Sequence, residues 1–111
     1  LHAEAYSAAE VLHGPAALVD SGFPVLALSQ RDATQPAMQA VLSRLSGFGA
    51  SVFAAGLDGD GLTALPVIEA DPALEPMLMV QRFYRMANTL SILRGFHPDT
   101  PPHLKKVTET V

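Results

Sequence analysis

The sequence predicts an α/β fold built on a parallel sheet, and three observations support this prediction. The runs at 23–29 and 51–56 are continuously apolar, which is typical of parallel strands. The predicted elements alternate as strand, helix, strand, strand, helix after a short first helix. The chain has 111 residues, of which 49% are hydrophobic and 16% charged. This is one domain or part of one, with apolar surface left for burial against the rest of the same protein or a second subunit.

The first predicted element is a short helix that begins after Ser7. Ser7 and Glu10 have the spacing of a capping box, in which the glutamate reaches back to the serine amide. Gly14 and Pro15 are expected to end this helix directly after His13. The residues that follow, up to position 19, can form one more helical turn.

The strand predicted over 23–29 begins near Pro24, where a missing N–H matters least. A helix is expected to follow, with Thr34 as its N-cap and with Gly47 and Gly49 at its end. Apolar residues in this helix recur at i, i+3, i+4 and i+7, so one face is expected to pack on the sheet. These residues are Met38, Val41, Leu42 and Leu45.

The second half of the chain predicts two strands and a long helix. A strand over 51–56 is followed by a turn at 58–61 and by a weaker strand at 65–68, expected at an edge because of Pro66. The long helix is expected to start near Pro76 and to stop at Gly95. Its apolar stripe consists of Met79, Phe83, Met86, Ala87, Leu90 and Leu93.

His13 is the main candidate for chemistry. Its position beside a sharp turn, three residues after Glu10, gives the imidazole a fixed direction. A histidine has a proton affinity suited to acid–base work near neutral pH. The alternative is a structural histidine at a helix C-terminus, where the helix dipole favours the cation. Local spacing alone favours the structural alternative.

Composition narrows the classes of partner and cofactor. The net charge of −4 and the lack of a basic stripe argue against nucleic acid as a partner. No apolar run has transmembrane length, so no membrane is expected, and the absence of cysteine suits a cytoplasmic protein. The histidines at 2, 13, 97 and 103 share no short ligand spacing, so no metal is expected.

The run His2-Ala3-Glu4-Ala5-Tyr6, followed by Ala9-Glu10-Val11-Leu12-His13-Gly14-Pro15, resembles the sugar isomerase (SIS) domain family. In particular, it resembles the second SIS domain of the isomerase half of glucosamine-6-phosphate synthase and its relatives. That family carries H-A-E-A-Y, then G/A-E-x-x-H-G-P, and ends in P-x-x-L-x-K-S/V-x-T. The chain ends similarly, in Pro101-Pro102-His103-Leu104-Lys105-Lys106-Val107-Thr108-Glu109-Thr110-Val111.

The resemblance covers essentially the whole chain and implies a domain organisation. It implies a three-layer flavodoxin-like SIS domain with a parallel sheet, in the C-terminal portion of a double-SIS chain. Residues 1–95 would be the C-terminal part of a SIS domain, and residues 96–111 an extended tail that closes over the active site. The chain would then be a piece of a longer polypeptide.

The resemblance also implies an activity. This would be a phosphosugar isomerase- or deaminase-type enzyme that acts on hexosamine or ketose 6-phosphates by ring opening and aldose–ketose proton transfer. The same core in this family supports deamination, deglycation and aminotransferase-like amino transfer, without a metal or organic cofactor. The histidine that matches His13 opens the sugar ring and serves the site of the neighbouring subunit, which implies a homodimer with shared active sites.

Further site residues follow from the same match. Lys106 aligns with the family's tail lysine and is the second catalytic candidate, and its neighbour Lys105 is a candidate for substrate binding. Glu4 and Tyr6 are candidates to line the substrate cleft, with packing as the alternative. Ser7, Glu10 and Gly14 are expected to cap the helix and orient the histidine.

Two other functions remain open from the sequence. SIS domains also occur as sugar-phosphate sensors that bind the ligand without reaction, and a flavodoxin-like domain can serve dimerisation alone. The H-G-P turn and the lysine-bearing tail favour an enzyme. The resembling enzymes have their phosphate-binding loops and their proton-transferring glutamate before the H-A-E-A-Y run, so we expect residues 1–111 alone to be inactive.

Overall fold

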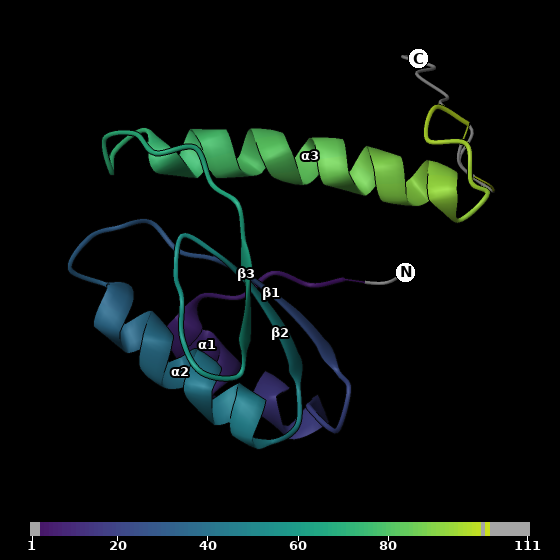
Figure 1. Ribbon diagram of the computed structural model, residues 1–111. Coiled ribbons are helices and arrows are strands. Elements are labelled where there is room, and N and C mark those ends of the chain that lie inside the picture. The colour runs from purple at the N-terminus through teal and green to yellow at the C-terminus, as the bar shows by residue number, and fades with distance from the viewer. Residues whose placement is uncertain (1–2, 101, 103–111) are drawn as a thin grey trace, which may run out of the picture. The chain divides into compact units, whose positions relative to one another are not determined.

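The computed structural model describes residues 3–100 and 102. Its elements are α1 (Ala8–Val11), a 3-10 helix η1 (Pro15–Leu18), β1 (Pro24–Leu28), α2 (Gln35–Gly47), β2 (Ser51–Ala55), β3 (Leu62–Leu65) and α3 (Glu75–Leu93) (Figure 1). The chain divides into two compact units, and the division falls inside α3, between Met79 and Val80. Every contact described below, other than those at the C-terminal end of α3, lies within the first unit.

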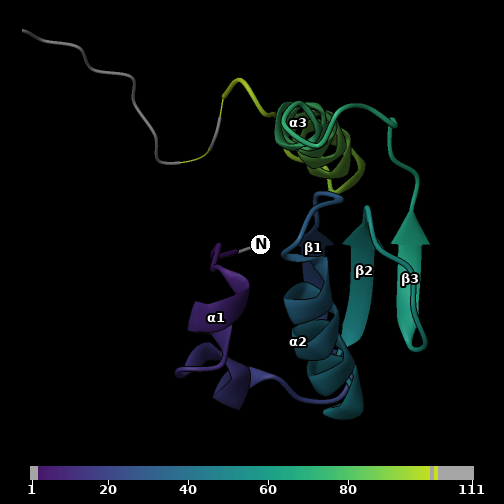
Figure 2. The ribbon, with the colours of Figure 1, turned by 90° about the vertical axis from the view of Figure 1, so that its left-hand side faces the viewer.

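The three strands form one parallel sheet in the order β1-β2-β3 (Figure 2). Ala54 in the middle strand pairs with Ala27 of β1 and with Ala64 of β3. Parallel neighbours need a crossover connection, and α2 supplies it between β1 and β2. These observations confirm the predicted α/β fold with a parallel sheet, which is consistent with a flavodoxin-like SIS domain.

The core lies between α2 and the sheet, where the predicted stripe of α2 is confirmed. Leu42 and Leu45 retain 2% and 1% of their surface exposed, and they cluster with Val52 and Ala54 of β2. Side chains of α1 and η1 pack against the same cluster. Thr34 is the N-cap of α2, as predicted, but its hydroxyl donates to Asp32 Oδ1 at 2.5 Å and does not cap the helix.

Replacing Leu45 with alanine should lower the free energy of unfolding by roughly 2–5 kcal/mol, because the change leaves a cavity in a closely packed core. Leu18→Ala is the matched control, since Leu18 keeps 74% of its surface exposed. Urea unfolding of the full-length protein measures both variants. Equal effects of the two changes would contradict the core assigned to this unit.

The strand predicted at 65–68 is wrong, because β3 spans Leu62–Leu65 instead. Proline has no N–H to donate to the neighbouring strand, and the observed strand stops directly before Pro66. The preceding turn also fixes the start of β3. Gly61 has φ +74, and a Cβ atom there would lie 2.3 Å from Ser46 Oγ.

The predicted start and end of the long helix are close to those observed. Pro76 is the second residue of α3, and Gly95, two residues after Leu93, has φ +78. The Gly95 N–H donates to the Ile92 carbonyl at 2.9 Å and the Phe96 N–H to the Ser91 carbonyl at 3.0 Å. This pair of bonds is a Schellman motif, which favours glycine at the left-handed position. Across the described residues, no helix combines the length and apolarity needed to span a bilayer.

Candidate functional site

The segment that leads to His13 begins with a complete capping box. The Ser7 N–H donates to Glu10 Oε2 at 3.0 Å, and the Glu10 N–H donates to Ser7 Oγ at 3.3 Å. The Ser7 hydroxyl also donates to Glu10 Oε2, at 2.7 Å, and these bonds from the side chain and backbone of Ser7 lower the pKa of Glu10. This carboxylate is therefore held ionised as part of the cap.

His13 lies in the turn between α1 and η1. Its N–H donates to the Glu10 carbonyl at 3.0 Å, which fixes its backbone to the last turn of α1. Gly14 follows as the N-cap of η1, with φ 164 and ψ −57, and Pro15 begins η1. The His13 side chain is exposed. The imidazole is therefore exposed to solvent on a turn that is fixed by α1 on one side and by η1 on the other.

Glu4 and Tyr6 lie just before α1 and contact each other. The Tyr6 hydroxyl donates to Glu4 Oε2, and this hydrogen bond raises the pKa of Tyr6. Tyr6 keeps 48% of its surface exposed, and neither residue belongs to the core cluster. The pair can offer polar groups to a ligand, with Tyr6 in its protonated form.

Five of the predicted site residues lie on the short stretch from Glu4 to His13, and of the tail the structure describes residues 96–100 and 102. Ser7 and Glu10 bond each other, and Glu4 and Tyr6 form the pair before them. Lys105 and Lys106 lie outside the described residues, as do His2 and His103. The predicted meeting of His13 with a tail lysine stays a prediction.

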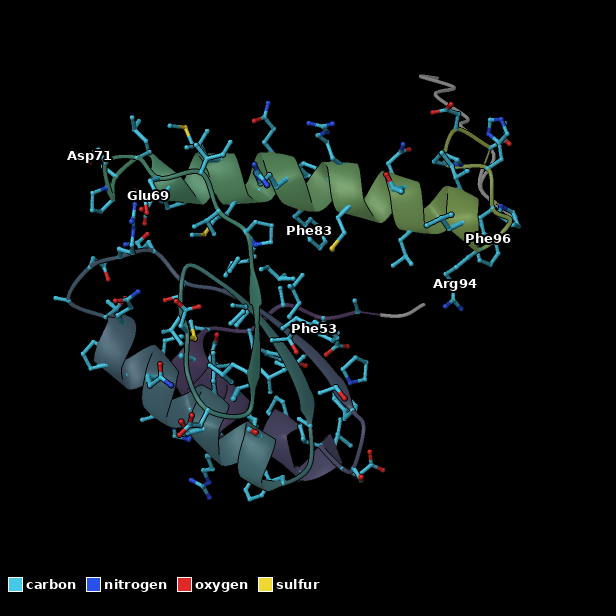
Figure 3. All side chains as sticks on the ribbon, viewed as in Figure 1. Phe53, Glu69, Asp71, Phe83, Arg94 and Phe96 are labelled. Atoms are coloured by element: carbon cyan, nitrogen blue, oxygen red, sulfur yellow. The ribbon has the colours of Figure 1, made fainter. Side chains whose placement is uncertain are left out.

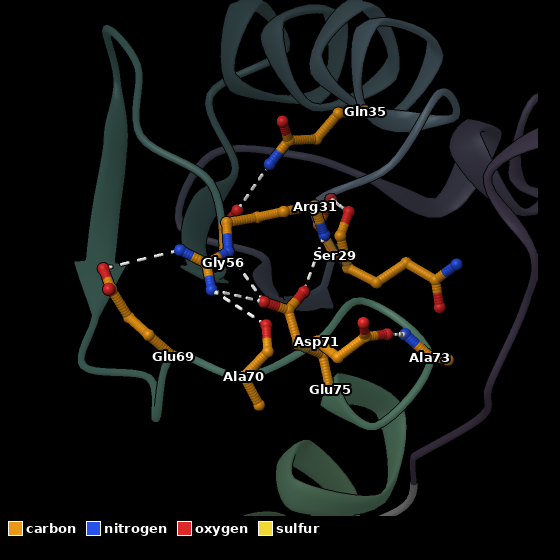
Figure 4. Close-up of polar contacts among 10 residues, drawn as sticks. Ser29, Arg31, Gln35, Gly56, Glu69, Ala70, Asp71, Ala73 and Glu75 are labelled. Atoms are coloured by element: carbon orange, nitrogen blue, oxygen red, sulfur yellow. Dashed lines mark hydrogen bonds and ion pairs between the residues drawn. The ribbon is translucent and has the colours of Figure 1, made fainter.

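A second polar cluster, which the sequence analysis missed, lies where β1 and β2 end (Figure 4). Ser29, 3% exposed, follows β1 directly, and its N–H donates to the Ala55 carbonyl at 2.9 Å. The Gln35 side chain donates to the Gly56 carbonyl at 2.7 Å. A shallow groove at this edge is lined by Arg31, Asp32, Ala33, Gln35, Pro36, Gln39, Gly56, Leu57 and Asp58.

The sequence did carry a signal for this cluster. The polar run Ser29-Gln30-Arg31-Asp32 begins as soon as the apolar strand ends. In parallel α/β sheets, functional side chains gather at the carboxyl ends of the strands. No local pattern indicates the partner of Arg31, because Glu75 lies 44 residues later in the sequence.

Glu75 and Arg31 are joined by several short polar contacts at this edge. The Glu75 side chain is 2% exposed; its Oε2 accepts the Arg31 backbone N–H at 2.7 Å, and its Oε1 accepts Nε at 2.7 Å and pairs with Nη2 at 2.6 Å. The backbone hydrogen bond from Arg31, followed by the side-chain bond, lowers the pKa of Glu75. Arg31 also lies 3.4 Å from Glu69 Oε1. The guanidinium therefore faces two carboxylates.

Comparison with known proteins gives relatives along nearly the whole chain. No profile of a known protein family matches it. The chain is 33% identical over 112 residues to the glutamine–fructose-6-phosphate aminotransferase (isomerizing) of Aeropyrum pernix, covering 96% of this chain and 18% of that protein. Proteins of the same name from Arabidopsis thaliana and Thermus thermophilus are each 30% identical, over 122 and 112 residues. They are covered to 17% and 18% of their length, against 99% and 96% of this chain.

The chain thus spans less than a fifth of the length of these curated relatives. The similarity runs through both the His13 segment and α3, since it covers 96% of the chain or more. The chain is a homologue of a segment of the glutamine–fructose-6-phosphate aminotransferases (isomerizing), which is consistent with the predicted fragment of a SIS domain.

Proposed function

We propose that this chain is part of a phosphosugar isomerase- or deaminase-type enzyme that acts on hexosamine or ketose 6-phosphates. The relatives are named as isomerizing aminotransferases of fructose 6-phosphate, which supports an aldose–ketose chemistry. The observation that carries the proposal is the exposed imidazole of His13 on a turn held by a capped helix and η1. A sensor has no need of an acid–base group in that position.

His13 acts in ring opening. A cyclic sugar opens when the anomeric hydroxyl loses its proton, the bond between the anomeric carbon and the ring oxygen breaks, and the ring oxygen gains a proton. A neutral imidazole accepts the first proton and delivers the second. The open-chain sugar then exchanges a proton between C1 and C2 through an enediol or enolamine.

The neighbouring residues have supporting roles in this proposal. Glu10 orients the histidine and does not serve as the base for C1–C2 transfer, because its carboxylate already accepts hydrogen bonds from Ser7. Glu4 and Tyr6 contact the sugar at the edge of the site. Lys106 approaches the open-chain sugar from the tail formed by residues 96–111, with Lys105 beside it, and the site is completed by a second copy in a homodimer.

The test is turnover by the full-length protein. We expect fructose 6-phosphate or glucosamine 6-phosphate, incubated in heavy water, to exchange hydrogen for deuterium at C1 or C2 and to interconvert with its aldose or ketose partner. Proton NMR follows both changes. A protein that binds these sugar phosphates but catalyses no exchange would be a sensor, and the proposal would be wrong.

A further inference from the structure

The start of α3 is held by a buried carboxylate. Both oxygens of Glu75 accept hydrogen bonds from Arg31, one from its backbone and one from its side chain, at 2.7 Å each (Figure 4). The two residues come from different parts of the first unit, the loop after β1 and the first turn of α3. A buried ion pair adds little net stability, but the removal of one partner leaves an unpaired buried charge. The contact therefore strongly favours one position of this helical turn.

A second contact, one helical turn later, acts on the same face. Residues four apart in a helix lie above one another, and Met79 follows Glu75 at this spacing. The Met79 Cε lies 2.9 Å from the point where a Cβ of Gly56 would stand. In the described chain, Glu75 and Met79 are the buried residues of α3. The first turn of α3 is thus seated on the ends of β1 and β2.

The segment that leads into α3 is bound by the same arginine. Residues 66–74 have no helix or strand, and Arg31 Nη2 donates to the Ala70 carbonyl at 3.5 Å. Asp71 then folds the chain into the helix, because its Oδ1 accepts from the Ala73 N–H at 2.9 Å and its carbonyl from the Leu74 N–H at 2.8 Å. Figure 3 shows Glu69 and Asp71 on this connection. Arg31 therefore holds both the connection and the helix that follows.

We propose that Glu75, acting through Arg31, is a positioning residue that fixes the first turn of α3 on the ends of β1 and β2. α3 runs from this turn to Leu93, and the tail follows it along the chain. The Arg31 guanidinium pairs with the carboxylates of Glu69 and Glu75 in this arrangement, so it does not serve as an anion-binding site. The kinetic part of this inference rests on the proposed function, in which Lys106 follows in the tail.

Glu75→Gln is the informative variant, since it keeps the size of the side chain. An amide offers one oxygen and one NH₂ group, so it satisfies either the Arg31 backbone N–H or the guanidinium and turns a donor toward the other. Glu69→Gln is the matched control, because Glu69 also pairs with Arg31 but its side chain is 82% exposed. Ion pairs of that kind contribute little.

Two readouts are taken on the full-length protein at a temperature well below unfolding. Hydrogen exchange of the amides over residues 75–79 should become at least about tenfold faster in Glu75→Gln, with exchange in β2 unchanged. Turnover of the sugar phosphate should lose at least about tenfold in kcat with KM nearly constant, because a misplaced reacting group weakens the transition state more than substrate binding. Glu69→Gln should alter neither readout.

Each other outcome overturns a stated part of the inference. Unchanged exchange over residues 75–79 would show that Glu75 does not hold the first turn of α3. Faster exchange with unchanged kcat and KM would leave a structural contact and refute the positioning role. If the unaltered protein binds sugar phosphate without turnover, the proposed function has failed, the kinetic role of Glu75 falls with it, and exchange alone decides whether the contact holds α3.

Discussion

Replacing His13 with asparagine is expected to slow turnover of a cyclic sugar phosphate by about 10²–10⁴-fold, the usual contribution of general acid–base catalysis. Asparagine retains polar character but takes up no proton near neutral pH. Because His13 is exposed, the substitution should leave the free energy of unfolding nearly unchanged. KM should change little, since ring opening follows binding. Steady-state kinetics of the full-length protein gives both constants.

Two controls separate ring opening from other losses. 5-Deoxyfructose 6-phosphate lacks the hydroxyl that closes the furanose ring, so it reaches the enzyme in the open form. His13→Asn should process this substrate at the rate of the unaltered protein. Asp20→Asn changes an exposed side chain that the proposed mechanism does not use, and it should leave turnover unchanged. Equal loss on the open and cyclic substrates would refute the ring-opening role.

Gly56→Ala is expected to have the largest effect on folding. Gly56 has φ +82, and a Cβ there would stand 2.0 Å from the Ser29 carbonyl oxygen and 2.9 Å from Met79 Cε. A non-glycine residue in the left-handed region costs roughly 1–2 kcal/mol, and the clash with rigid backbone adds to this, so we expect a loss of at least about 3 kcal/mol. Thermal or urea unfolding of the full-length protein measures the loss.

Gly22→Ala is the control for this backbone argument. Gly22 has nearly the same φ, +81, but no atom within 4 Å of an added Cβ. It should show only the cost of the left-handed conformation, about 1–2 kcal/mol. If both substitutions lower the free energy of unfolding equally, the close approach of Gly56 to Ser29 has no energetic importance. The packing of α3 against the strand ends would then lose this support.

Much of the fold could be predicted because the signals are local. The capping pair Ser7 and Glu10, the stripe of α2 and the stop at Gly95 each follow from residues within a few positions of one another. The third strand was placed too late along the chain. Its start depends on the close contact of Gly61 with Ser46 of α2, which no local pattern reveals.

The candidate site divides in the same way. His13, Ser7 and Glu10 were found because they share one short motif. Arg31 and Glu75 were missed because the sheet brings together residues that are distant in sequence. A glutamate is common in the first turn of a helix, where its negative charge interacts favourably with the helix dipole. Only its burial against Arg31 distinguishes it.

The measurement that tests the central claim most directly is a crystal structure of the full-length protein with an unreactive cyclic sugar phosphate bound. The account predicts one His13 ring nitrogen within about 3 Å of the ring oxygen or anomeric hydroxyl, with Lys106 at the same ligand and a second subunit at the site. A His13 ring enclosed within its own subunit, away from any bound sugar, would contradict it.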